Sequence, residues 1–201
     1  MLSAFLLGQS TQPSANLVPN GNFEIAANNP RSVSGWQPLR NGYERILTDT
    51  RRKHVVKFSI PAEIARREGF HFFSERFPIE HERIYRCRAD IHTSGPHVVL
   101  FLNGYANIGG KERRAYRQVK SGKHVKANEW GTLDFQFTPR QPSTMSNKIR
   151  RFGQKSKYEI GRLEVEFFIY GSDEGVVQID NIEIIPVSPD AETRPASRAL
   201  N

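Results

Sequence analysis

Short stretches of alternating apolar and polar residues recur along this chain, and they constrain its fold more than any other feature. Clusters of Gly, Pro, Asn and Ser separate them. The predicted strands cover residues 55–60, 70–79, 85–92, 98–105, 114–119, 131–138, 162–170 and 176–185. One charged stretch, 62–68, is the only weak helical segment. Many short strands with turns between them predict an all-β antiparallel sandwich or jelly roll, not a fold of alternating strands and helices.

The length of 201 residues fits one domain, and an aromatic content of 10% supports a packed core. We place this domain at 16–187. Residues 1–15 begin with an apolar run and end in small residues, which indicates the remnant of a secretory signal peptide or a frayed terminus. The polar residues 188–201 are expected to be disordered. The possible signal-peptide remnant leads us to expect a secreted, periplasmic or cell-surface location. No apolar run is long enough to span a membrane.

The alternation also assigns faces, because successive side chains of a strand point to opposite sides of the sheet. In 85–92 it places Cys87 in the core as an inert thiol and Arg88 on the opposite face. In 162–170 it leaves Glu164, Glu166, Phe168 and Tyr170 outside the core. The stretch 98–105 is apolar on both faces before Asn103, which favours a central strand covered on both sides.

The most distinctive segments lie at the two ends of the alternating region. Residues 16–24 read Asn-Leu-Val-Pro-Asn-Gly-Asn-Phe-Glu, a turn that leads into an apolar residue and a carboxylate. Residues 177–184 read Val-Gln-Ile-Asp-Asn-Ile-Glu-Ile, which alternates as a half-buried strand does. A chain with these two ends resembles the carbohydrate-binding modules of the galactose-binding-like jelly-roll class, families 4, 9 and 22. The resemblance implies that the first and last strands are neighbours and that the domain binds polysaccharide without catalysis.

The resemblance also implies a structural calcium ion close to the terminal strands. Its expected ligands are Glu24, Asp180 and Asn22, with help from backbone carbonyl groups, because Ca²⁺ takes six to eight oxygen ligands. If the terminal strands are adjacent, the two carboxylates approach each other and need a cation between them. In the alternative, Asp180 caps a turn together with Asn181, and Glu24 is solvated.

Sugar binding requires aromatic faces and planar polar side chains on one surface. The segment 103–117 carries aromatic residues beside basic ones around a Gly-Gly loop, and we predict the binding edge there. The candidate ligand-binding residues are Tyr105, Tyr116, Asn103, Arg88, Arg117, Glu164, Glu166 and Tyr43. Trp36 and Trp130 are expected to pack in the core or at its margin. In the alternative, the polar candidates form cross-strand ion pairs on a solvated sheet.

The net charge of +8 raises the question of an acidic partner. The basic residues are scattered over predicted turns, so a solvated surface is the first interpretation, an anionic polymer the second, and nucleic acid is not favoured. His spacings typical of metal sites, the Gly-x-Ser-x-Gly motif and a phosphate-binding loop are absent from the sequence. We therefore predict a protein that is not an enzyme. The alternative function is a structural or adhesion sandwich that contacts protein or an anionic cell-envelope polymer.

Overall fold

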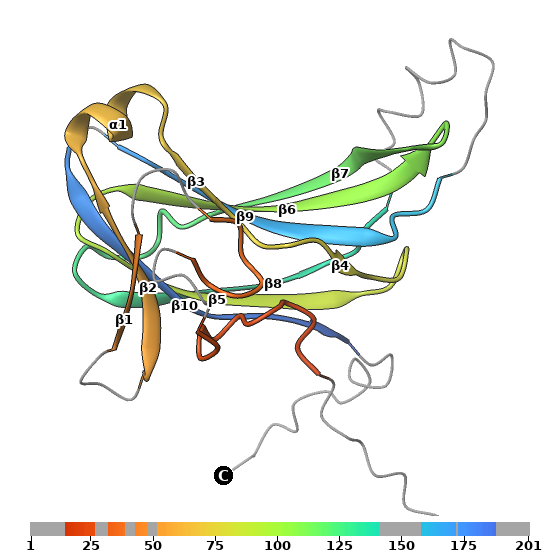
Figure 1. Ribbon diagram of the computed structural model, residues 1–201, viewed down its shortest axis with the longest axis horizontal. Helices are drawn as coiled ribbons and strands as arrows, with labels where there is room; N and C mark the ends of the chain where they lie inside the picture. Colours follow the sequence, from red (N-terminus) through yellow and green to blue (C-terminus); the bar gives the residue numbers. More distant parts are fainter. Residues whose placement is uncertain are drawn as a thin grey trace, which may run out of the picture.

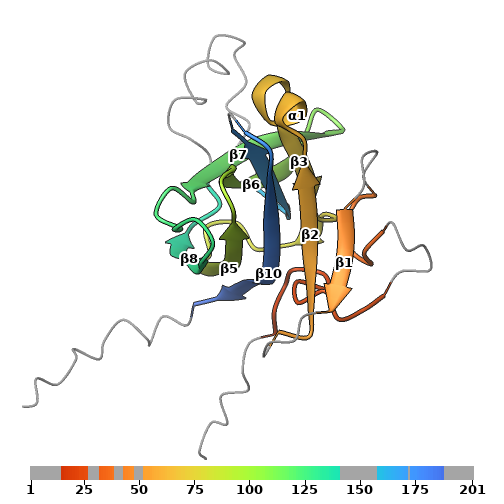
Figure 2. The ribbon, with the colours of Figure 1, turned by 90° about the vertical axis from the view of Figure 1, so that its left-hand side faces the viewer.

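A computed structural model describes residues 15–26, 32–38, 43–47, 52–140, 158–171 and 173–187, with backbone only for 43–47. Two antiparallel sheets lie face to face (Figures 1 and 2). The first sheet has the order β1 (Tyr43–Leu47), β2 (His54–Ile60), β10 (Gly175–Pro186), β5 (Tyr85–Thr93), β8 (Trp130–Phe137). The second has the order β3 (Phe70–Phe73), β9 (Arg162–Tyr170), β6 (His97–Ile108), β7 (Lys111–Ser121), with β4 (Phe77–Pro78) also paired to β9. The predicted all-β sandwich is confirmed.

Most predicted strands agree with the structure to within a few residues, and α1 (Ala62–Arg67) occupies the predicted helical stretch. β6 and β7 are longer than predicted because they continue to a two-residue hairpin loop. Gly109 and Gly110 form this loop with φ of +63° and +76°, the left-handed conformation that a tight hairpin requires. The predicted strand 70–79 is divided into β3 and β4, and β1 was not predicted. The described residues contain no helix that is long and apolar enough to span a bilayer.

The core lies between the sheets and is lined by the inward positions of each strand. β9 contributes Leu163, Val165, Phe167 and Ile169, all fully buried, as the alternation predicts. Cys87 is buried, and burial raises the pKa of its thiol, as expected for an inert side chain. Trp36 is also in the core, stacked on Phe72 with ring centroids 4.5 Å apart. Trp130 is half-buried at the margin of the first sheet.

The two distinctive end segments lie side by side, as the resemblance implied. The Asn16 side chain donates to the carbonyl of Ile182 at 2.8 Å and accepts from the backbone N–H of Ile184 at 2.9 Å. The N–H of Ile182 donates to the carbonyl of Gly21 at 2.8 Å. Ile182 lies within a β-bulge of β10, between Asp180 and Glu183, where the register with β5 shifts. The expected signal-peptide remnant, apart from residue 15, and the C-terminal tail lie outside the described residues.

Candidate functional site

The most suggestive surface is the side of the second sheet that faces away from the core, called the outer face here (Figure 1). Directly paired residues of antiparallel strands share a face. The register pairs Asn103 of β6 with Glu164 of β9 and with Arg117 of β7. It also pairs Glu166 with Phe73 of β3. Side chains from four strands therefore meet on the outer face, and they include five of the predicted ligand-binding residues: Asn103, Tyr105, Arg117, Glu164 and Glu166.

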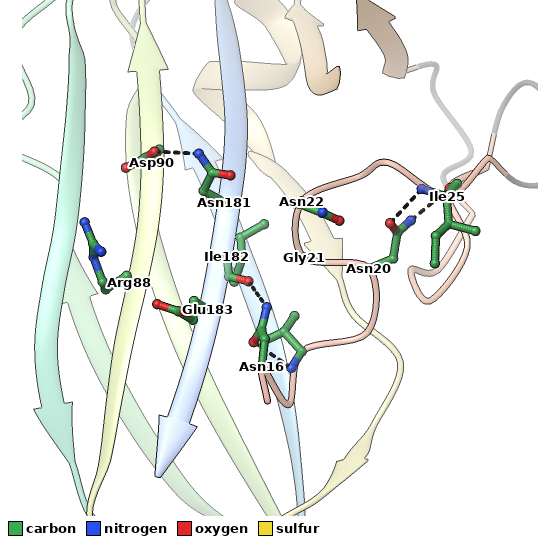
Figure 3. Close-up of a pocket in the computed structure, with 11 residues that line it drawn as sticks. Asn16, Asn20, Gly21, Asn22, Ile25, Arg88, Asp90, Asn181, Ile182 and Glu183 are labelled. Atoms are coloured by element: carbon green, nitrogen blue, oxygen red, sulfur yellow. Dashed lines mark hydrogen bonds between the residues drawn. The ribbon is translucent and has the colours of Figure 1, made fainter. Parts of the chain in front are cut away.

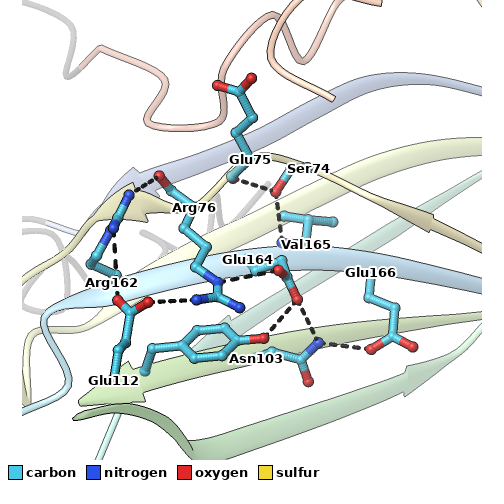
Figure 4. Close-up of polar contacts among 10 residues, drawn as sticks. Ser74, Glu75, Arg76, Asn103, Glu112, Arg162, Glu164, Val165 and Glu166 are labelled. Carbon is cyan, nitrogen blue, oxygen red and sulfur yellow. Dashed lines mark hydrogen bonds and ion pairs between the residues drawn. The ribbon is translucent and has the colours of Figure 1, made fainter. Parts of the chain in front are cut away.

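These five residues form one hydrogen-bonded network at the centre of the outer face, part of which is drawn in Figure 4. Glu166 accepts from Asn103 Nδ2 at 2.7 Å and from Arg117 Nη2 at 2.6 Å, and its other oxygen lies 2.8 Å from His71 Nδ1. Glu164 accepts from the Tyr105 hydroxyl at 2.9 Å and forms a longer contact with Arg76 Nε at 3.4 Å. The network fixes the positions of the polar side chains before any ligand arrives.

Both carboxylates of this network are buried, each residue being 3% exposed. Burial acts to raise the pKa of Glu166, but hydrogen bonds from Asn103, His71 and Arg117 outweigh it, so its pKa lies below the ordinary value. Burial, with the neighbouring Glu164, raises the pKa of Tyr105. Glu166 is therefore ionised and Tyr105 neutral near pH 7. The prediction placed the two glutamates outside the core correctly, but their neighbours cover them.

A row of stacked rings, called the ring stripe here, lies beside the network and consists of Phe73, His71, Phe168 and Tyr170. Neighbouring centroids are 5.8 Å apart for Phe73 and His71, 4.5 Å for His71 and Phe168, and 5.2 Å for Phe168 and Tyr170. The interplanar angles are 7°, 26° and 18° respectively. The His71 side chain is 43% exposed, and the other three residues are half-buried. Such a stripe can stack on the apolar C–H faces of sugar rings.

Two further rings of the outer face are covered by guanidinium groups. Arg76 lies over the Tyr105 ring, 3.7 Å from its centroid, and Arg117 lies over Phe101 at 3.9 Å. The Tyr105 ring therefore supports Arg76 on one side, and its hydroxyl is bound to Glu164. On this half of the outer face the two rings are therefore covered by arginines and do not form bare aromatic surfaces.

The structure separates the other three predicted ligand-binding residues from this network. Tyr116 is a correction, because it was expected beside Tyr105 but pairs with Gly104, across the β-bulge at Gly104/Tyr105. Its side chain packs at that glycine in the core, is 8% exposed, and has its pKa raised to about 12 by burial. Arg88 lies on the first sheet. Tyr43 begins β1, and its side chain is outside the described part of the chain.

Sequence reasoning missed the contributions of Arg76, His71 and the rings of Phe73, Phe101 and Phe168. A signal for Phe168 and Tyr170 was present, because the alternation of β9 already left both on the outer side. His71 and Phe73 could have been found in the same way in β3, once its pairing with β9 was known. The position of Arg76 follows from the irregular backbone between β3 and β4, which no strand periodicity describes.

Arg88 belongs to a cavity of about 530 Å³ between the N-terminal segment and the first sheet (Figure 3). Asn16, Asn20 and Asn181 line it, but their side chains are used within the protein. Asn16 and Asn20 bind backbone groups, and Asn181 donates to Asp90 at 3.0 Å. The Asn16 contact attaches the N-terminal segment to the first sheet, and the other two are made within the N-terminal region and within the sheet.

The predicted calcium ligands have other partners. Glu24 accepts from the backbone N–H of His54 at 3.2 Å, and its second oxygen lies 2.9 Å from His54 Nδ1. The hydrogen bond with His54 lowers the pKa of Glu24. Asp180 is bound by Arg52 Nη1 at 3.1 Å, and Asn22 contacts the N–H of Glu24 at 3.4 Å. Within the described ranges no group of three or more His, Cys, Asp or Glu side chains is placed to hold a metal ion.

Arg52 supplies a cationic group beside Asp180, one of the predicted calcium ligands. Asp90 and Asp180 face each other in the register of β5 and β10, and Arg52 Nη1 lies 2.7 Å from one and 3.1 Å from the other. Its guanidinium group also lies 3.9 Å from the centroid of Trp130. Burial raises the pKa of Asp180 and acts in the same direction on Asp90, where hydrogen bonds from Thr132, Asn181 and Arg52 outweigh it and lower the pKa.

No protein-family profile and no curated protein matches the sequence. Solved structures with the same fold include a family 16 carbohydrate-binding module, with 11% identity, a TM-score of 0.53, and coverage of 85% of this chain and 99% of that one. An arabinose-bound α-L-arabinofuranosidase has 14% identity and a TM-score of 0.53, and the match covers 86% of this chain but 26% of the enzyme. A family 22 xylan-binding domain from Paenibacillus barcinonensis has 10% identity, a TM-score of 0.49, and coverage of 89% and 99%. The chain has the β-sandwich fold of the jelly-roll carbohydrate-binding modules.

Proposed function

We propose that this chain binds polysaccharide without catalysis, through the outer face of its second sheet. The observation that carries the proposal is the ring stripe lying beside a fixed polar network on one surface. The half-buried rings offer apolar surface to pyranose C–H groups, and the partly exposed guanidinium groups of Arg76 and Arg117 offer donors to hydroxyl groups. The fold shared with carbohydrate-binding modules supports the same function.

The positions of Glu164 and Glu166 support a binding role over a catalytic one. A glycosidase needs one carboxyl group that can donate a proton and a second that can attack or activate water. Here both carboxylates accept hydrogen bonds from neighbouring side chains and are buried, so neither is presented to a substrate. They orient Asn103, Arg117 and Tyr105, which is the work of a rigid binding surface.

The proposal predicts that Phe168→Ala weakens polysaccharide binding by about 10-fold or more, because the comparable stacking of a nucleic-acid base on one aromatic ring contributes about 1–3 kcal/mol. Phe168 is the centre of the stripe, in contact with both His71 and Tyr170. A screen of glucans, xylans, mannans and acidic polymers first identifies the soluble polysaccharides that the wild-type protein binds. Isothermal titration calorimetry then measures the affinity of each variant for them.

The matched control is Tyr170→Phe, which keeps the ring of the stripe and removes its hydroxyl group. We expect this variant to bind within about threefold of the wild type, since stacking depends on the ring. Circular dichroism and thermal unfolding show whether each variant is folded. Unchanged affinity in a folded Phe168→Ala protein would move the site away from this face. A folded wild type that binds no glycan would instead favour the structural or adhesion sandwich.

Calcium stabilisation stays a prediction of the family resemblance, and the donor set described above favours Arg52 as the cation at Asp180. We therefore expect the Tm in millimolar CaCl₂ and the Tm in EDTA to differ by about 1 °C or less. An ion that binds only the folded state at 100 times its Kd would add about 2.7 kcal/mol, a shift of several degrees. A rise of that size with Ca²⁺, lost in Glu24→Gln, would restore the calcium hypothesis.

We also propose that the protein is exported from the cell, since the proposed ligand is a polymer found outside cells.

A further inference from the structure

The half of the outer face around Tyr105 is built from arginines. Tyr105 is paired with Arg114 of β7 on one side and with Arg162 of β9 on the other. Both neighbours emerge on the outer face, since paired residues of antiparallel strands share a face. Arg76 stacks on the Tyr105 ring at 3.7 Å, so three arginines neighbour a single tyrosine. Arg117, over Phe101, lies in the next row of the sheet.

The carboxylates in contact with these arginines do not neutralise all of the positive charge at the surface. Glu164 and Glu166 are buried at 3% exposure and occupied by the network. Glu112 is the more exposed partner, and it is shared by Arg76 at 2.5 Å and Arg162 at 3.7 Å (Figure 4).

The remaining charge lies on the arginines themselves. The Arg162 side chain is 53% exposed. Arg114 is exposed too, and in the part of the chain that the structure describes no carboxylate forms an ion pair with it. The exposed surface around Tyr105 is therefore cationic, and the carboxylates beneath it are buried and already hydrogen-bonded.

We propose that the ligand of the outer face is an acidic polysaccharide, with its carboxylate or sulfate groups bound by Arg114 and Arg162 and its sugar rings on the ring stripe. The inference rests on the proposed function and names the ligand class of that same site. A guanidinium group matches a carboxylate or sulfate with two parallel N–H donors, which a hydroxyl group of a neutral sugar cannot use as well. The rings that a neutral glycan would use near Tyr105 and Phe101 are covered by Arg76 and Arg117.

The test compares pairs of polymers that share a backbone and differ in charge. The pairs are polygalacturonate with its highly methyl-esterified form, carboxymethylcellulose with hydroxyethylcellulose, and dextran sulfate with dextran. The variant is Arg114→Gln/Arg162→Gln. The control is Lys123→Gln/Lys126→Gln, which removes the same charge from the exposed loop between β7 and β8. Affinities are measured at 50 mM and 300 mM NaCl, because exposed charge contacts weaken with salt.

We expect one acidic polymer to bind about 10-fold or more tighter than its neutral partner. The arginine variant should lose about 10-fold or more of that affinity, since charge-assisted hydrogen bonds are the strongest in such sites. Affinity for the neutral partner should stay within about threefold, and the lysine control should resemble the wild type. Preference for dextran sulfate over the carboxylated polymers identifies sulfate as the bound group, and the reverse identifies carboxylate.

Other results overturn the inference in distinguishable ways. Equal binding of charged and neutral partners, unchanged in the arginine variant, removes the acidic ligand and leaves the proposed function intact. An equal loss in the lysine control means that only overall charge acts. Tighter binding of a single-stranded oligonucleotide than of any polysaccharide assigns the arginines to nucleic acid. Failure of the folded wild type to bind any of the six polymers or the neutral glycans contradicts the proposed function itself.

Discussion

Replacement of Gly21 by alanine is expected to lower the free energy of unfolding by about 2–3 kcal/mol, or about 5–10 °C in Tm for a chain of this size. A Cβ atom at Gly21 would lie 2.0 Å from the carbonyl oxygen of Ile182, and a backbone atom cannot turn aside as a side chain can. The N-terminal segment would have to move away from β10, which also breaks the hydrogen bond from the Ile182 N–H to the Gly21 carbonyl. Thermal unfolding measures the effect.

Gly95→Ala is the matched control for this prediction. A Cβ atom at Gly95 meets nothing within 4 Å. We expect its Tm to lie within about 2 °C of the wild type, since surface substitutions away from special features change stability by about 0.5 kcal/mol or less. If Gly21→Ala were as stable as Gly95→Ala, Gly21 would not lie in close contact with Ile182. The packing of the two end segments against each other would then not explain why they occur together in this chain.

Arg52→Ala is expected to cost about 2–4 kcal/mol at pH 7, because removing one partner of a buried ion pair leaves uncompensated charge. The charge left behind is that of Asp90 and Asp180, which face each other and have side chains 14% and 3% exposed. Without Arg52 each carboxylate loses the cation that favours its ionised form, so the folded-state pKa of the pair rises above its unfolded value. The destabilisation is therefore full above the raised pKa and fades as the pH falls through it.

The measurement is the difference in Tm between wild type and Arg52→Ala at pH 7 and at pH 4, which should be smaller at pH 4. A second substitution checks the cause. Asp90→Asn should destabilise the wild type by removing an ion pair, and should stabilise the Arg52→Ala protein by removing a repulsion. A loss that is the same at both pH values, with no change of sign in the double variant, would mean that Arg52 acts through packing on Trp130 and not through its charge.

The sequence was sufficient for the fold because the core positions of this chain follow strand periodicity closely. β9 shows this best, with Leu163, Val165, Phe167 and Ile169 buried on one side as predicted. Periodicity fails where the register shifts. The bulge at Gly104/Tyr105 places Tyr116 inside the sandwich, and the bulge at Asp180/Glu183 includes Ile182, which contacts the N-terminal segment. A β-bulge leaves one extra residue of a strand unpaired, and a single sequence does not reveal where this happens.

The site could be predicted only in part, for a similar reason. Asn103, Tyr105, Arg117, Glu164 and Glu166 were named because they are polar or aromatic residues at outward positions of strands, and the structure brings them together. Their partner His71 comes from β3, whose place in the sheet is not fixed by local pattern, and Arg76 comes from the irregular backbone that follows β3. The ion pair of Arg52 with Asp180 joins residues 128 positions apart, so the sequence alone gave no reason to prefer an arginine over a metal ion.

The most direct test of polysaccharide binding by the outer face is an NMR titration of the ¹⁵N-labelled protein with an oligosaccharide of the tightest-binding polymer. We expect the backbone shifts to change at five residues of the second sheet: His71, Asn103, Arg117, Phe168 and Tyr170. Those of Arg88 and Glu183, on the first sheet, should not change. Saturable shifts confined to the first sheet or to the cavity beside Arg88 would rule out binding at the outer face.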